Sequence, residues 1–165
     1  ISKNSLPGDA LFSVKSVFEK ATLNNLELAQ KRMGDLKAIA QENKVKNLSE
    51  TIKEFKANVG EVSKNIAGLV DKEPGKALQA GMELVQLQKD KAAIEQILGT
   101  AFDGDTEREL KSATKYLVEN ELEDLLTRTL AEEQKVLLEA GIIAYQAEDY
   151  ELALEMVWKI SNAAD

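Results

Sequence analysis

The feature that most constrains the fold is an apolar stripe in the middle of the chain, spaced alternately by four and three residues. This spacing places every member on one face of a helix, and about three heptads of it indicate a long helix that packs against a partner at a shallow angle. The sequence therefore predicts a helix that begins near residue 48 and ends at the DKEPG break, with this face buried. The stripe consists of Leu48, Ile52, Phe55, Val59, Val62, Ile66 and Leu69.

A second stripe upstream supplies a partner for this helix. The short polar segment ENKVKN at 42–47 separates the two stripes, and such a short connection favours an antiparallel hairpin. The segment TLNN at 22–25 weakly interrupts the upstream pattern, so residues 9–41 form either two short helices or one bent helix. The members of this stripe are Leu26, Ala29, Met33, Leu36 and Ala40.

Four more helices follow in the second half of the chain. Pro74 suits a helix start, and GTAFDGD at 99–105 reads as a loop. The chain is rich in Ala, Leu, Glu and Lys and has two prolines, a composition typical of helices. We expect an all-α fold, a mostly antiparallel bundle of six to seven helices. The four expected helices span residues 75–98, about 106–129, 131–147 and 149–163.

We expect two halves, which could also be one continuous domain: an N-terminal half at 1–71 and an acidic half at 74–165. Residues 1–101 hold fifteen basic and thirteen acidic groups, whereas residues 102–165 hold six basic and sixteen acidic groups. A surface with a net charge of −10 repels phosphate backbones, so we expect no nucleic-acid partner.

The residue types present argue against catalysis and metal binding. The chain has neither cysteine nor histidine, which excludes thiol nucleophiles, disulfides, Cys/His zinc sites and histidine acid–base chemistry. The acidic segments at 119–124 and 131–135 are read as solvated helix faces. DGDTE at 103–107 fails as a calcium loop, because the sixth and twelfth positions hold Arg108 and Thr114. We therefore expect no enzyme activity, no cofactor and no metal.

Residues 137–160 resemble a tetratricopeptide helical hairpin. Gly141, Tyr145, Tyr150 and Ala153 fall at the spacings where that repeat places small and aromatic residues. Small residues let two antiparallel helices approach closely, and Tyr150 would fill the turn. The resemblance implies a repeat-like hairpin that could offer a peptide-binding groove.

The resemblance is limited to one repeat unit, whereas a stable array needs about three. Val157 stands where the repeat has an aromatic residue in its second helix. Three aromatic residues are candidates for partner binding: Tyr145, Tyr150 and Trp158. Trp158 is either an anchor for a partner or a packing residue of the hairpin.

The opening stretch LPGDALFSVKSVFEKA is similar to the start of an uncharacterised bacterial extracytoplasmic domain family with the pattern L-P-G-D-x-L-Y/F-x-V/L-K. The similarity covers residues 5–66, and Ser13 stands where the family often has proline. Such domains follow a signal peptide or a single membrane anchor, so the resemblance implies an exported, non-catalytic protein. The residues that match the motif include Pro7, Gly8, Asp9, Leu11 and Lys15.

These observations predict a non-enzymatic extracytoplasmic interaction or sensing domain of an anchored or exported bacterial envelope protein. Its partner would be a protein or a peptide, and it would meet the membrane only through an upstream anchor. Because the chain starts at Ile1 rather than methionine, we expect a longer gene product. The rigid turn at Pro7 would then set how the helical domain leaves that anchor, or simply pack the first helix. The alternative is a cytoplasmic tetratricopeptide-like adaptor.

Overall fold

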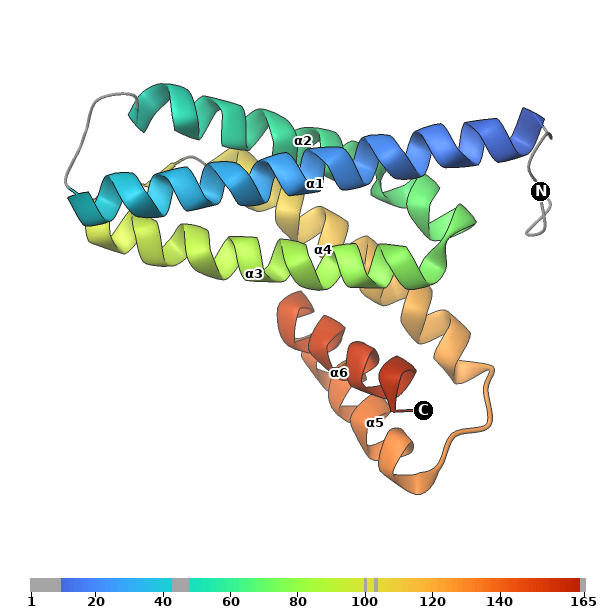
Figure 1. Cartoon of the computed structure of the whole chain (residues 1–165). Helices are drawn as coiled ribbons and strands as arrows, with labels where there is room; N and C mark the ends of the chain where they lie inside the picture. Colours follow the sequence, from blue (N-terminus) through green and yellow to red (C-terminus); the bar gives the residue numbers. More distant parts are fainter. Residues whose placement is uncertain (1–9, 43–47, 100, 103, 164–165) are drawn as a thin grey trace.

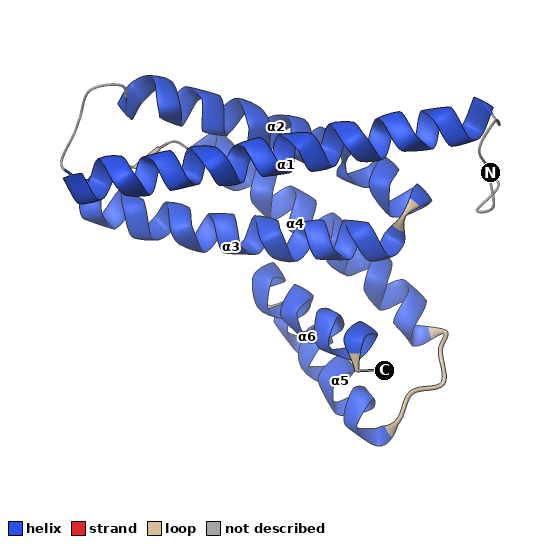
Figure 2. Ribbon diagram, in the orientation of Figure 1, coloured by secondary structure: helices blue, strands red, loops and turns tan. Residues whose placement is uncertain are grey.

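The computed structural model describes residues 10–42, 48–99, 101–102 and 104–163, with side chains from Ala21 onward apart from that of Glu42. Within these ranges the chain forms helices joined by short turns and contains no strand (Figure 2), which confirms the predicted all-α class. The helices are α1 (Ala10–Glu42), α2 (Leu48–Lys72), α3 (Pro74–Leu98), α4 (Gly104–Leu126), α5 (Glu132–Gln146) and α6 (Tyr150–Asn162).

Four long helices build a bundle, and the last two form a hairpin attached to it (Figure 1). Helices α1 and α2 lie side by side and run in opposite directions, as the polar connection between the stripes predicts. Helix α3 packs beside α1, and α4 packs beside α2 and α3. The α5–α6 hairpin rests on α4 and α3, chiefly through α6. The C-terminal hairpin is thus an appendage to a bundle that the first four helices share.

The two predicted stripes form the centre of the core. On α2 the stripe is buried from Phe55 to Leu69, and Leu48 and Ile52 at its start are half-buried. Each large apolar side chain removed from water in this way contributes about 1.5–3 kcal/mol. Buried residues of α3, α4 and α6 belong to the same core cluster. The turn at Glu73 therefore separates α2 from α3, but the residues on its two sides share one core.

Helix α1 runs without a break through the TLNN segment, where the sequence pattern alone allowed two separate helices. The asparagine and threonine side chains there would favour a turn in an isolated peptide. In the folded chain Thr22 is buried, and the Asn25 Nδ2 donates to the Ala21 carbonyl one turn back. The helix continues because tertiary contacts with α2 outweigh the local preference.

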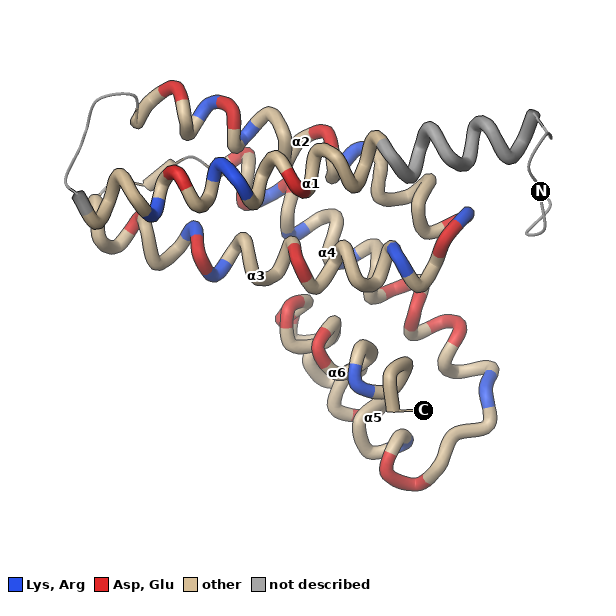
Figure 3. Tube along the Cα trace, in the orientation of Figure 1, with Lys and Arg blue, Asp and Glu red and all other residues tan. Residues whose placement is uncertain are grey.

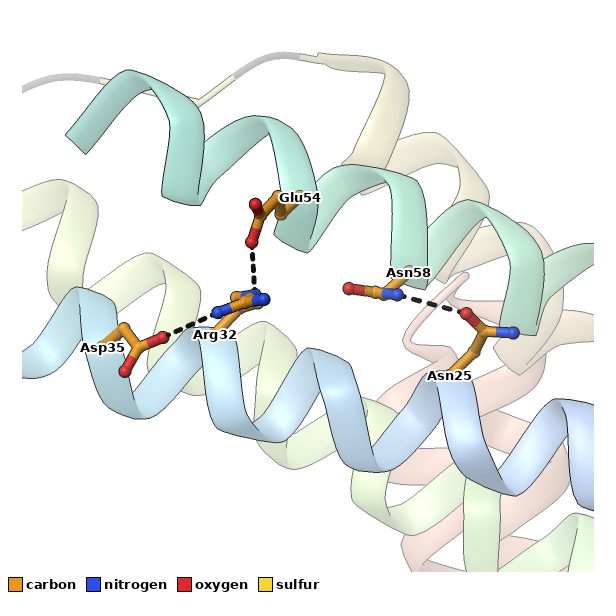
Figure 4. Close-up of polar contacts among 5 residues, drawn as sticks. All are labelled: Asn25, Arg32, Asp35, Glu54 and Asn58. Atoms are coloured by element: carbon orange, nitrogen blue, oxygen red, sulfur yellow. Dashed lines mark hydrogen bonds and ion pairs between the residues drawn. The ribbon is translucent and has the colours of Figure 1, made fainter. Parts of the chain in front are cut away.

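Polar contacts between α1 and α2 fix how these two helices align (Figure 4). The Asn58 Nδ2 donates to the Asn25 Oδ1 at 3.1 Å. Two turns further along α1, the Arg32 guanidinium lies between Asp35 at 3.2 Å and Glu54 at 2.5 Å. Polar pairs at a helix interface meet in only one register, so they select one alignment of the apolar stripes.

The helix ends follow ordinary capping chemistry. Pro74 opens α3, and Gly99 closes it in the left-handed region with φ of 65°, its amide donating to the Glu95 carbonyl. Helix α4 ends at Leu126, about one turn earlier than the sequence predicts. Asp149 caps α6 by accepting from the Leu152 amide at 3.1 Å.

Candidate interaction surface

The C-terminal hairpin is held in place by a close approach of three helices around Gly81. A Cβ atom at this position would lie 2.5 Å from Leu117 Cδ1 on α4 and 3.1 Å from Leu154 Cδ2 on α6. All three residues are buried. Glycine at this position therefore lets α3 approach α4 and the hairpin without displacing Leu117 and Leu154.

The two helices of the hairpin lie within van der Waals distance of each other at Gly141. A Cβ atom on Gly141 would meet Met156 Cβ at 3.4 Å and the Ala153 carbonyl oxygen at 3.9 Å. Gly141 and Ala153 are both buried where α5 and α6 meet. Helix α5 buries only Gly141 and Ala144 completely, and its remaining contacts are partial.

Hydrogen bonds and ion pairs between side chains tie the hairpin to the bundle. The Tyr145 hydroxyl donates to Glu119 Oε1 on α4. The Ser161 hydroxyl donates to Glu121 Oε1 at 2.7 Å. Lys89 on α3 donates to Glu155 on α6 at 2.7 Å, and this bond raises the pKa of Lys89. The hairpin therefore presents its outer surface in a fixed position relative to the bundle.

Two of the three aromatic candidates from the sequence come together at the turn of the hairpin. The Tyr145 and Tyr150 rings lie with centroids 5.5 Å apart at 52°, and Lys111 Nζ lies 5.6 Å from the centre of the Tyr150 ring. The hydrogen bond to Glu119, followed by burial and by charge, raises the pKa of Tyr145 to about 12. Trp158 is half-buried against the core. In this structure all three take part in packing within the chain.

The opening motif falls largely outside the described residues. Pro7, Gly8 and Asp9 precede the first described residue, so the predicted turn and N-cap remain predictions. Leu11 and Lys15 lie in the first turns of α1, and their side chains are likewise outside the description.

The outer face of α5 carries apolar residues that the sequence analysis did not single out. Val136 is 67% exposed and Ile143, two helical turns further on, is 60% exposed. Ala140 lies between them on the same face and is half-buried. We call Val136, Ala140 and Ile143 the α5 stripe. The sequence contains the pattern of this stripe, because its members are spaced by four and then three residues and lie on the side of the helix opposite Gly141.

Carboxylates border the α5 stripe. Glu132, Glu133 and Glu139 are exposed on the same helix, and acidic residues are prominent along α4, α5 and α6 in Figure 3. Lys135 is the basic residue of α5, and it pairs with Glu132 at 2.5 Å. The surface around the stripe is therefore both apolar and net negative.

Acidic groups also crowd the start of α6. Partial burial raises the pKa of Glu151, and the neighbouring carboxylates Asp149, Glu155 and Glu107 raise it further, whereas Lys89 lowers it. A carboxyl surrounded in this way holds its proton more readily than one in water. Several carboxylates therefore lie close to Glu151 at the start of α6.

Two hollows in the described part of the chain lie away from the α5 stripe. A cleft of about 520 Å³ lies where the α2–α3 turn, α4 and α6 meet, and its lining includes Leu78, Glu121 and Arg128. A groove of about 330 Å³ runs between α2 and α4 and is lined largely by small residues such as Gly60 and Ala113.

The described residues hold no group of three or more carboxylates placed to bind a metal ion. Among the helices of the described ranges, none has both the length and the hydropathy that crossing a lipid bilayer requires.

Comparisons with known proteins place the chain in no family. No protein-family model matches it, no curated protein matches it, and no solved structure matches it. The resemblances of residues 5–66 and 137–160 therefore stay predictions.

Proposed function

We propose that the chain is a non-enzymatic interaction domain that binds a protein or peptide partner on its C-terminal hairpin. The observation that carries this proposal is the α5 stripe. Val136 and Ile143 expose most of their apolar surface on one face of a helix that is itself only partly buried. Adjacent exposed apolar residues with a polar border are typical of protein-binding surfaces.

The way the hairpin is attached supports the same function. Contacts at Gly81, Glu119 and Glu121 hold the hairpin on α3 and α4, so the stripe lies on a hairpin that is packed against the bundle. A surface that is already held by such contacts loses little conformational freedom when a partner docks, which favours binding. In this proposal Tyr145 and Tyr150 position the hairpin, and α5 makes the contact.

The extracytoplasmic location is a separate part of the proposal and rests on the resemblance of residues 5–66. A full-length gene product with a hydrophobic leader or anchor, and its recovery in an envelope fraction, would support export. Recovery of the full-length product only in the cytoplasmic fraction would instead favour the adaptor alternative.

Affinity capture with matched surface variants tests the interaction. The bait is the intact chain, and the variant Val136→Ser/Ile143→Ser removes the apolar side chains of the stripe without adding charge. Ile97→Ser is the matched control, because Ile97 is 65% exposed and lies in the last turn of α3, outside the hairpin. We expect the stripe variant to lose a specific partner that the wild type and the control retain. Equal capture by all three would contradict the proposal.

A further inference from the structure

Resting on the proposed function, we infer that the partner segment is a basic amphipathic helix. Its apolar face lies over Val136 and Ile143, and its lysines or arginines face the bordering carboxylates. Helix-in-groove and helix-on-helix recognition uses apolar residues at i, i+3, i+4 and i+7. The α5 stripe has this spacing, so a helix of matching period fits along it.

The charge around the stripe indicates which kind of partner can bind there. The three carboxylates that border it are exposed and belong to a region of −10 net charge. A second copy of the chain would bring these carboxylates against their own counterparts. Anionic lipid surfaces and nucleic acids would be repelled in the same way. A basic segment is the occupant that gains from both the apolar and the acidic features.

The residues of α5 itself leave this negative charge largely unmatched. Lys135 already pairs with Glu132, and no ion pair with a cation is found for Glu133 or Glu139 among the described residues. Both side chains are exposed and flank the stripe on opposite sides. A partner cation on either side of its apolar face therefore meets an available carboxylate.

The length of α5 sets the length of the partner helix. Helix α5 has 15 residues and so is about 22 Å long. A partner helix of about four turns would cover the stripe together with its acidic border. Because this contact is small, we expect weak, salt-dependent binding in which the apolar residues set the affinity and the charges speed association.

The test is a titration of the full chain with synthetic helical peptides of about 18 residues, followed by fluorescence anisotropy. The probe places leucine on one face and lysine on the other. One comparison peptide has glutamate in place of lysine, and another has the same residues as the probe in an order that abolishes the apolar face. We expect only the amphipathic lysine peptide to bind.

Variants of the chain show whether binding occurs at the stripe. Val136→Ser/Ile143→Ser should weaken binding by about tenfold or more, since a few central side chains dominate small interfaces. The variant Glu132→Gln/Glu133→Gln/Glu139→Gln should bind several-fold more weakly and lose much of the salt dependence. Ile97→Ser should bind like the wild type, and circular dichroism checks that all variants remain folded.

Some outcomes overturn this inference alone. One is that the glutamate peptide binds as tightly as the lysine peptide. Another is that the stripe substitutions do not change binding of the lysine peptide. A third is that the chain binds anionic vesicles or a second copy of itself more tightly than it binds the lysine peptide. If the stripe variant still loses its captured partner in such a case, the proposed function stands and only the basic character of the partner is wrong. Capture that is indifferent to the stripe would overturn the proposed function itself.

Discussion

The hydroxyl of Tyr145 donates a hydrogen bond to the Glu119 carboxylate, which joins the last turn of α5 to the second half of α4. An ionised Tyr145 would place two negative charges at contact distance. The hydrogen bond therefore favours the protonated phenol, and together with burial and charge it raises the pKa of Tyr145 to about 12.

This hydrogen bond predicts that Tyr145 ionises at a higher pH than a free tyrosine, and that the folded chain loses stability over the same pH range. Because the pKa in the folded chain is raised, the stabilisation is complete below pH 10 and is lost as the pH rises toward about 12. Tyr145→Phe should lower the melting temperature at neutral pH, and Glu119→Gln should return the phenol toward its ordinary pKa. Phenolate absorbance and thermal unfolding measure the two effects.

Tyr150→Phe is the control for this prediction, since Tyr150 contributes ring contacts at the same turn. It should leave both the melting temperature and the late titration nearly unchanged. A wild-type Tyr145 that ionises near its ordinary pKa of 10.0 would contradict the bond.

A second prediction concerns Gly81, where α3, α4 and α6 meet. Gly81→Ala gains up to about 1 kcal/mol of helix propensity but must displace Leu117 and Leu154, and such overpacking of a core costs about 1–3 kcal/mol. We expect a net loss of about 1 kcal/mol in the free energy of unfolding, measured by urea denaturation. Gly34→Ala on α1 meets no atom within 4 Å and should instead stabilise the chain. Equal stabilisation by both substitutions would show that the junction is loose.

A third prediction concerns the ion pair between Lys91 and Glu95, which lies under the Phe102 ring. Lys91 is 5% exposed, and its ammonium lies 5.7 Å from the centre of that ring. Lys91→Met leaves a largely buried carboxylate without its cation and should cost about 3 kcal/mol. Lys91→Met/Glu95→Leu removes both charges and should return to within about 1 kcal/mol of the wild type, or exceed it.

Urea denaturation of the wild type, Lys91→Met, Glu95→Leu and the double variant gives the coupling energy of this pair. Additive losses in the double variant would mean that the two charges do not depend on one another.

A fourth prediction follows from Glu83, which faces α1 and accepts a hydrogen bond from Gln30. Burial raises the pKa of Glu83, although the bond from Gln30 opposes the shift. The raised pKa means that protonation stabilises the fold. This contribution is complete below pH 4.5 and is lost as the pH rises through the pKa of the folded state.

Glu83→Gln mimics the protonated carboxyl, so it should raise the melting temperature at neutral pH and lose this advantage below pH 4.5. Glu139→Gln on the exposed face of α5 serves as the control and should change stability by less than about 0.5 kcal/mol. An advantage of Glu83→Gln that persists unchanged in acid would rule out titration of Glu83 as its cause.

Much of the fold follows from apolar periodicity. The stripe from Leu48 to Leu69 and its partner from Leu26 to Leu36 lie where their spacing predicts, because a 3.6-residue period places them on one buried face. Local preference was less informative at Asn25. Its side chain favours a turn in a peptide, yet the partner that it meets, Asn58, is 33 residues away.

The α5 stripe was missed for a related reason. Its residues repeat with the same period as the buried face of α5, so the sequence offers two apolar faces and does not say which one is covered. Gly141 faces α6, and this choice leaves Val136 and Ile143 outside.

By itself, the sequence determined the all-α class, the positions of the helices and the absence of thiol and imidazole chemistry, because these depend on residue type and on spacing along one helix. Only the tertiary structure decided that α1 is unbroken, that Tyr145 pairs with Glu119, and which face of α5 meets solvent. Those outcomes depend on contacts between residues far apart in the chain, whose free energies local spacing does not encode.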